Sequence, residues 1–234
     1  MKLISIREFK GKIVLKSGLH IGAGDTEMRI GGTDNPVIKH PHTLDPYIPG
    51  SSLKGKIRSL LELKSGILGE RTNHSGSPLG LDDLTHDNDK QECRKILKLF
   101  GMSGADTDEK GEIGPSRLSF ADCTLDAEWK EKALARNLPF TEVKSENSID
   151  RITGTAQHPR FTERVPAETE FRFSVSLKVF DNDESLALDD SLLQGMKLLE
   201  MDALGGSGSR GYGRIRFIFD DADIQKKFEG TQPL

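Results

Sequence analysis

A stretch of strict alternation near the end of the chain constrains the fold most. Apolar residues occupy every second position there: Phe171, Phe173, Val175, Leu177 and Val179. The positions between them are polar. Because successive side chains of a β-strand point to opposite faces, this pattern predicts a strand over 169–180 with one buried face.

The spacing of apolar residues elsewhere predicts further elements around this strand. In chain order the long elements are a strand over 9–16, a helix over 51–64, a strand over 117–124, the strand over 169–180, a helix over 189–204 and a strand over 212–219. For the first helix, Ser51 or Ser52 is the expected N-cap. The order βαββαβ predicts an α+β fold with a ferredoxin-like (RRM-like) core. We expect one domain over 1–234 with large insertions.

Two polar segments interrupt this plan. The first, 67–114, holds one amphipathic helix over 91–100, and we interpret it as a lid-like subdomain inserted into the core. His74, His86 and Cys93 within it could bind zinc with a fourth ligand, or the histidines could simply lie on the surface, since their spacing matches no standard zinc motif. The second segment, 145–167, has too few apolar residues for a core and predicts a projecting hairpin.

The charge balance limits the kind of partner. The net charge of −4 excludes a chain that is basic all over, so a nucleic-acid surface has to be a local basic face. The two cysteines are too few for a disulfide framework, which favours a reducing compartment. Without a signal peptide or a long apolar run, we expect a soluble, cytoplasmic protein that is not in a membrane.

The loop over 205–213, GGSGSRGYG, has five glycines in nine positions. Such a backbone can take positive φ angles and approach a ligand closely, which suits a phosphate backbone. The loop can equally be a tight helix-to-strand turn. On the first helix, Lys54 and Arg58 are i,i+4 neighbours near the N-terminus, where they make either an anion site or a solvated charged face.

The aromatic signature with which RNA-recognition modules stack bases on their sheet is absent, so RNA would have to bind through loops. Three further motifs accompany the predicted plan: GLHIGAGD, PYIPGSSLKGKIR and LGGSGSRGYGRI. Together they resemble the RAMP superfamily over nearly the whole chain. GGTDNPVI and SIDRITGTA are more specific, and are similar to the backbone subunits of type III-A CRISPR (Csm) effector complexes, which cleave target RNA.

That resemblance assigns roles to individual residues. It implies that Asp34, in GGTDNPVI, is catalytic, although an aspartate beside glycine and proline is also an ordinary turn residue. It implies that 149–161 forms a thumb that wedges into the guide–target duplex. The residues that it implies in RNA binding are His20, Lys54, Lys56, Arg58, Arg151, Ile152, Thr153, Ser209, Arg210, Tyr212 and Arg214.

The resemblance also implies the partners and the chemistry. The expected partners are a CRISPR guide RNA, a target RNA, copies of the chain in a helical filament and the other Csm subunits. Cleavage by the 2′-OH needs that oxygen, the phosphorus and the leaving oxygen in line. Asp34 could act as a base or hold Mg²⁺ or another divalent ion, whose remaining ligands are unknown.

Two other functions remain open. The first is a scaffold that binds guide RNA and polymerises but does not cut. The second is a lone nuclease that processes the guide precursor, which is disfavoured because His20 has no obvious catalytic partner in the sequence.

Overall fold

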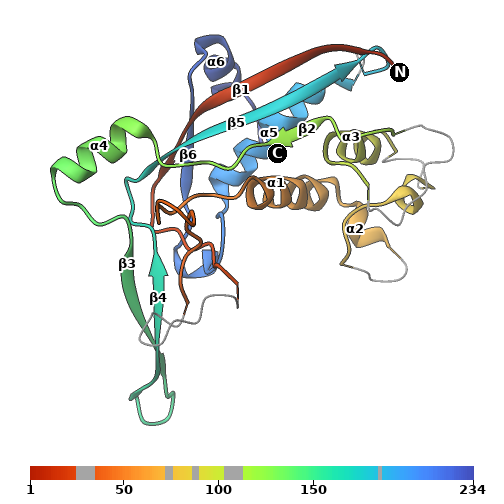
Figure 1. The fold of residues 1–234 in the computed structure, drawn as a ribbon. Helices are drawn as coiled ribbons and strands as arrows, with labels where there is room; N and C mark the ends of the chain where they lie inside the picture. Colours follow the sequence, from red (N-terminus) through yellow and green to blue (C-terminus); the bar gives the residue numbers. More distant parts are fainter. Residues whose placement is uncertain (25–34, 72–75, 86–89, 103–112, 184–185) are drawn as a thin grey trace.

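The computed structural model describes residues 1–24, 35–71, 76–85, 90–102, 113–183 and 186–234. Asp34, His74 and His86 lie outside the described residues, so the catalytic prediction for Asp34 and the zinc hypothesis are not tested by it. The protein is mixed α/β with two antiparallel sheets (Figure 1).

The larger sheet has four strands. They are β1 (Leu3–Leu15), β2 (Leu118–Phe120), β5 (Glu170–Phe180) and β6 (Ile215–Phe219). Their order is β2-β5-β1-β6, and every neighbouring pair is antiparallel. The alternation over β5 is confirmed, because Phe171, Phe173, Val175 and Leu177 are all buried.

Helices α1 (Gly50–Ser65) and α5 (Leu188–Met201) pack against each other beside this sheet (Figure 1). Gly195, in the middle of α5, explains how closely they pack. A Cβ at Gly195 would lie 2.6 Å from Cγ2 of Ile57. Glycine therefore costs some helix propensity here but permits the two helices to approach.

Aromatic rings fill the centre of the core. The ring centroid of Phe173 lies 5.4 Å from the centroids of both Phe217 and Phe219, in edge-to-face geometry. The ring centroid of Phe228 lies 5.0 Å from that of Phe219. These four rings are all buried. Phe228 belongs to α6 (Ala222–Glu229), a helix that the periodicity did not predict.

Several predicted boundaries were wrong for local reasons. Strand β1 begins at Leu3 rather than at 9, because its first six residues are exposed and show no burial alternation. The strand predicted over 117–124 shortens to β2, and Cys123 instead forms an isolated bridge with Ile48. The strand predicted to begin at 212 begins at Ile215.

The start of α1 also differs from the prediction. Neither Ser51 nor Ser52 caps it; the helix begins at Gly50, whose N–H donates to Oδ1 of Asp122 at 2.8 Å. A carboxylate from a distant part of the chain thus binds the positive end of the helix.

The segment predicted as an insertion over 67–114 adds α2 (Ile67–Glu70), a 3-10 helix η2 (Leu81–Thr85) and α3 (Lys90–Phe100). Its apolar residues enter the common core, among them Ile67, Leu79, Cys93, Ile96 and Leu97. Burial raises the pKa of the Cys93 thiol to about 12, which keeps it protonated. This segment therefore packs on the core as well as extending from it.

The second, two-stranded sheet is a ribbon of β3 (Glu142–Ile149) and β4 (Ala156–Arg164). It projects away from the four-stranded sheet, while helix α4 (Ala127–Ala135) precedes it in the chain (Figure 1). Among the described residues, no helix is long and apolar enough to cross a membrane.

Candidate nucleic-acid interface

Segments from three parts of the chain meet at the base of the ribbon. Leu19 and Val165 exchange backbone hydrogen bonds of 2.9 and 2.8 Å, which join the chain after β1 to the chain after β4. On the other side, Ile38 donates to the carbonyl of Ile21 at 2.8 Å. The segment around 19–23 is therefore held between the ribbon base and the segment around 35–38.

This arrangement locates the attachment point of Asp34. Its neighbour Asn35 forms a parallel bridge with Thr162 of β4, and the N–H of Glu163 donates to the carbonyl of Asn35 at 3.0 Å. Ala23, which precedes the residues that are not described, donates to the carbonyl of Pro36 at 3.2 Å. The described residues on the two sides of 25–34 are thus joined to each other, and Asn35 is joined to the ribbon.

His20 lies between the ribbon and the glycine-rich loop. Its Nδ1 is 2.7 Å from the carbonyl oxygen of Glu163, and because a carbonyl only accepts, Nδ1 carries the proton. The carbonyl of His20 accepts from the N–H of Gly206 at 2.9 Å. His20 is only partly buried. Its Nε2 forms no hydrogen bond within the described part of the chain.

Two glycines of the loop over 205–213 are required by the backbone. At Gly213, φ is +73° and a Cβ would lie 1.9 Å from the carbonyl oxygen of Leu204. At Gly205, φ is +75° and a Cβ would lie 2.4 Å from the carbonyl oxygen of His20. These close approaches let the loop pack on the chain around His20 without side chains between.

Tyr212 is buried, with 1% of its surface exposed, although the resemblance implies an RNA contact for it. Its hydroxyl donates to Oε1 of Glu146 at 2.9 Å. Lys144 Nζ lies 4.6 Å and the Arg164 guanidinium 5.0 Å from the ring centre. In this structure the ring fastens the loop to the ribbon, so a base cannot stack on it unless these contacts open.

Three other residues predicted at this loop are exposed: Ser209, Arg210 and Arg214. Arg210 donates to Oγ of Ser207 at 2.8 Å and lies 3.5 Å from Glu146. Arg214 donates to the carbonyl of Met201 at 2.9 Å. Both guanidiniums thus keep accessible surface for a phosphate.

The three predicted cations on α1 have different surroundings. Lys54 is partly buried and makes no ion pair with any described residue; burial and then the charge of Arg58 lower its pKa. Lys56 pairs with Asp202 at 2.6 Å. Arg58 is engaged on all three nitrogens, with Glu62 at 2.7 Å and with the carbonyls of Gly101 and Leu79.

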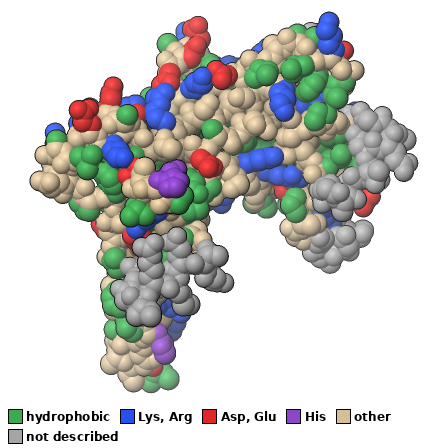
Figure 2. All heavy atoms as spheres, viewed as in Figure 1, with side chains coloured by type: hydrophobic (Ala, Val, Ile, Leu, Met, Phe, Trp, Pro, Cys, Tyr) green, Lys and Arg blue, Asp and Glu red, His purple; other side chains and the backbone are tan. Residues whose placement is uncertain are grey.

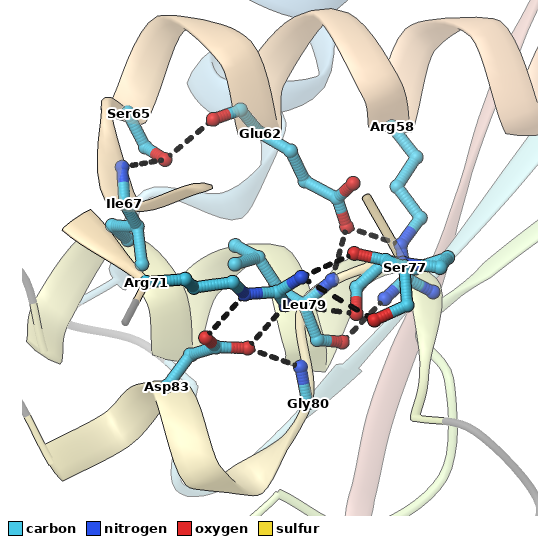
Figure 3. A network of polar contacts seen from close by, with 10 residues as sticks. Arg58, Glu62, Ser65, Ile67, Arg71, Ser77, Leu79, Gly80 and Asp83 are labelled. Carbon is cyan, nitrogen blue, oxygen red and sulfur yellow. Dashed lines mark hydrogen bonds and ion pairs between the residues drawn. The ribbon is translucent and has the colours of Figure 1, made fainter. Parts of the chain in front are cut away.

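Figure 3 shows that Arg58 is part of a network that holds the inserted segment to α1. Glu62 also accepts from the N–H of Leu79 at 3.0 Å. Beside it, Arg71 forms two hydrogen bonds with Asp83, at 2.8 and 2.6 Å. The contact of Arg58 with the guide RNA stays a prediction. Its bonds to Glu62, Gly101 and Leu79 show that it also holds the structure together.

The turn at the far end of the ribbon carries Arg151, Ile152 and Thr153, all exposed. Ile152 is 97% exposed. The carboxylate of Asp150 shapes the turn, since it accepts from the N–H groups of Ile152 and Thr153 at 2.9 and 2.8 Å. An apolar side chain held at the end of a polar ribbon is available to a partner.

Figure 2 shows the surface hollowed between the ribbon and the body, with Lys and Arg side chains where Figure 1 places α1. Five phenylalanines of the large sheet, Phe9, Phe171, Phe173, Phe217 and Phe219, are buried, and Phe120 of β2 is partly buried. RNA binding through loops stays a prediction. Within the described residues, no three His, Cys, Asp or Glu side chains gather as metal ligands.

Pattern analysis missed the acids and bases at the ribbon base: Lys144, Glu146, Glu163 and Arg164. They lie in two strands rich in charged and polar residues, so their side chains do not stand out from their neighbours in the sequence. Their importance comes from partners far along the chain, and no local signal reports those partners.

The sequence matches the family model "RAMP superfamily" over residues 12–216. A protein of Enterococcus italicus named "CRISPR system Cms endoribonuclease Csm3" is 38% identical over 91% of this chain and 90% of its own length. One of the same name from Streptococcus thermophilus is 40% identical, over 93% of each chain.

Solved structures agree. A chain of the "Csm3-Csm4 subcomplex in the type III-A CRISPR-Cas interference complex" has a TM-score of 0.54 at 30% identity, over 93% of this chain and 77% of that one. Csm3 of Methanopyrus kandleri has a TM-score of 0.60 at 24% identity, over 94% and 76%, which supports the fold alone. The chain therefore belongs to the RAMP superfamily and, within it, to the Csm3 family.

Proposed function

We propose that this chain is a guide-RNA-binding backbone subunit of a type III-A CRISPR interference complex, and that it cleaves complementary target RNA at regular intervals. Its relatives are named endoribonucleases, and a similar structure comes from a Csm3-Csm4 subcomplex. The observation that carries the proposal is the attachment of Asn35 to β4, because it places the residue after Asp34 on the ribbon.

We propose that the large sheet with α1 and α5 is a ferredoxin-like core. The support is the order β2-β5-β1-β6, in which the first and third strands of the βαββαβ plan lie in the centre. The ribbon of β3 and β4, which covers most of the hairpin predicted over 145–167, would be the thumb, and the segment over 67–114 the lid. The hollow between them is where we place the RNA (Figure 2).

In the proposed reaction, the ribbon displaces a target nucleotide so that its 2′-OH attacks the adjacent phosphorus in line. Asp34 takes the proton of that hydroxyl as a base, the bond from phosphorus to the 5′-oxygen of the next nucleotide breaks, and this oxygen leaves as a hydroxyl after protonation by water, so that a 2′,3′-cyclic phosphate remains. The guide would bind to Lys54, which is partly buried but makes no ion pair with a described residue, and to the exposed Arg210 and Arg214, with His20 beside the ribbon. A divalent ion would stabilise the charged phosphorane, but no described cluster supplies ligands for it, so most would be RNA oxygens.

Copies that stack along one guide make a heterologous contact, which gives an open filament. Each copy would bring one Asp34 and one ribbon, so cuts should recur at a fixed spacing. Sizing the protein with and without guide RNA tests this assembly. A two-fold dimer that ignores RNA would contradict it.

The decisive experiment replaces Asp34 in the assembled complex. Asp34→Ala and the nearly isosteric Asp34→Asn should abolish cutting of matched target RNA in Mg²⁺, and leave guide and target affinity unchanged. A parallel reaction in a chelator tests the need for a divalent ion. If both variants still cut at the same ladder of positions, Asp34 is a turn residue and a non-catalytic, guide-binding scaffold becomes the better assignment.

A further inference from the structure

The side chain of Glu163 lies in the strand that faces the segment after Asp34. Only 8% of Glu163 is exposed. Its Oε2 accepts from the N–H of Val37 at 2.9 Å and its Oε1 from Nζ of Lys39 at 2.6 Å. Both bonds cross from β4 to the segment over 35–39, so the carboxylate links the ribbon to that segment.

The main chain of Glu163 repeats this pattern. Its N–H donates to the carbonyl of Asn35 at 3.0 Å, and its carbonyl accepts from Nδ1 of His20 at 2.7 Å. One residue therefore binds two segments that the resemblance connects with RNA.

A buried carboxylate is unfavourable unless its charge is compensated. Burial raises the pKa of Glu163, but hydrogen bonds from Lys39, the Val37 amide and Thr141 outweigh it, so the pKa is lowered overall. The ribbon itself does not require this charge, because Glu163 pairs with Val143 through the backbone. Of its three donors, two belong to the segment over 35–39, so the charge holds that segment against the ribbon.

We propose that Glu163 is a positioning residue for RNA cleavage, which fixes the segment after Asp34 against the base of the ribbon. This inference rests on the cleavage function proposed above. Asn35 is covalently next to Asp34, so a shift of the segment moves the attachment point of the carboxylate relative to the ribbon. Misplacement by about 1 Å can slow a reaction about a hundredfold.

The test uses the assembled complex with guide RNA and a matched target. Glu163→Ala removes both bonds to the segment, whereas Glu163→Gln keeps an acceptor for the Val37 amide. We expect the single-turnover cutting rate to fall about a hundredfold in Glu163→Ala and distinctly less in Glu163→Gln, with guide and target Kd unchanged. The matched control is Glu142→Gln, whose carboxylate pairs with Arg164 at 2.7 Å inside the same ribbon.

Hydrogen exchange of the Val37 amide gives a readout apart from activity. It should become faster in Glu163→Ala and stay slow in Glu142→Gln. The proposal is overturned if Glu163→Ala cuts as fast as wild type, if Glu142→Gln slows cutting equally, or if Kd rises in parallel with the loss of rate. A wild-type complex that does not cut at all overturns the cleavage function together with this proposal, so the two failures can be told apart.

Discussion

The hydroxyl of Tyr212 donates a 2.9 Å hydrogen bond to Glu146, and this bond fastens the glycine-rich loop to the ribbon. The hydrogen bond from Tyr212 is also the main reason why the pKa of Glu146 is lowered, ahead of Lys144 and Arg210, whose charges act in the same direction. The two residues are 66 positions apart in sequence, so this bond is a tertiary contact between the loop and the ribbon.

Replacing this hydroxyl should weaken the protein measurably. Tyr212→Phe leaves the ring and its cation contacts in place, and we expect a loss of about 1–2 kcal/mol in the free energy of unfolding. Urea denaturation measures it. Tyr47→Phe is the matched control, because the Tyr47 hydroxyl forms no hydrogen bond with any described residue; an equal loss in both variants would contradict the assignment.

Two glycines of the same loop should differ strongly in how well they tolerate replacement by alanine. Gly213→Ala places a Cβ 1.9 Å from Leu204 O at a positive φ, so we expect a loss of about 3 kcal/mol or more. Gly206→Ala meets its nearest atom, Cδ2 of His20, at 3.5 Å, an ordinary contact, and should be near neutral. Denaturation of both variants is the measurement, and equal tolerance would show that the loop adapts.

Two cations of helix α1 should separate stability from RNA binding. Arg58→Ala leaves the buried Glu62 unpaired and two carbonyls without a donor, so we expect a loss of about 3 kcal/mol in unfolding free energy. Lys54→Ala should leave stability unchanged and reduce the slope of log K against log salt for the guide by about 0.7. An unchanged slope would remove Lys54 from the RNA path.

A buried ion pair predicts how stability depends on pH. Arg117 and Lys98 both bind Asp183, with Arg117 Nε at 2.9 Å. Burial raises the pKa of Asp183, but these hydrogen bonds and charges outweigh it, and the pKa is lowered overall. The stabilisation is therefore fully present above the usual aspartate pKa of about 4, and is lost as pH falls through the lower, folded value.

The free energy of unfolding of Asp183→Asn should accordingly be about 3–5 kcal/mol lower than that of wild type at pH 7. This difference should shrink below about pH 3. Urea denaturation at both pH values measures this. Asp220→Asn, which breaks the exposed pair with Arg172, should lose no more than about 1 kcal/mol. A deficit for Asp183→Asn that stays constant with pH would contradict the sign of the shift.

The sequence predicted most of the long elements because their apolar residues are periodic. Helix α1 and strand β5 are found nearly at their predicted boundaries. Helix α6 was missed because it is only eight residues long. Its start signal, the Asp221 carboxylate that accepts from the N–H groups of Asp223 and Ile224, was present in the sequence.

The site was less predictable than the fold. The family resemblance implied RNA contacts for Tyr212 and Arg58. In the structure the Tyr212 ring is buried, and the Arg58 guanidinium binds Glu62 and two backbone carbonyls. Glu163 could not have been selected, because its significance lies in Val37 and Lys39, more than a hundred positions away. Such contacts depend on tertiary structure, which local pattern does not encode.

Within the described residues, the ribbon of β3 and β4 contacts the body over its first half, from the base around Glu163 to Glu146, and its far half projects like the arm of a lever. Its eight-residue strand β3 spans about 27 Å at the usual rise per residue. A rotation of about 10° at the base would sweep Ile152 through about 5 Å, by the geometry of an arm of that length. How far the turn around Ile152 moves therefore depends on the stiffness of a few bonds nearer the body, those that Glu146 makes with Tyr212 and that Glu163 makes with the segment over 35–39.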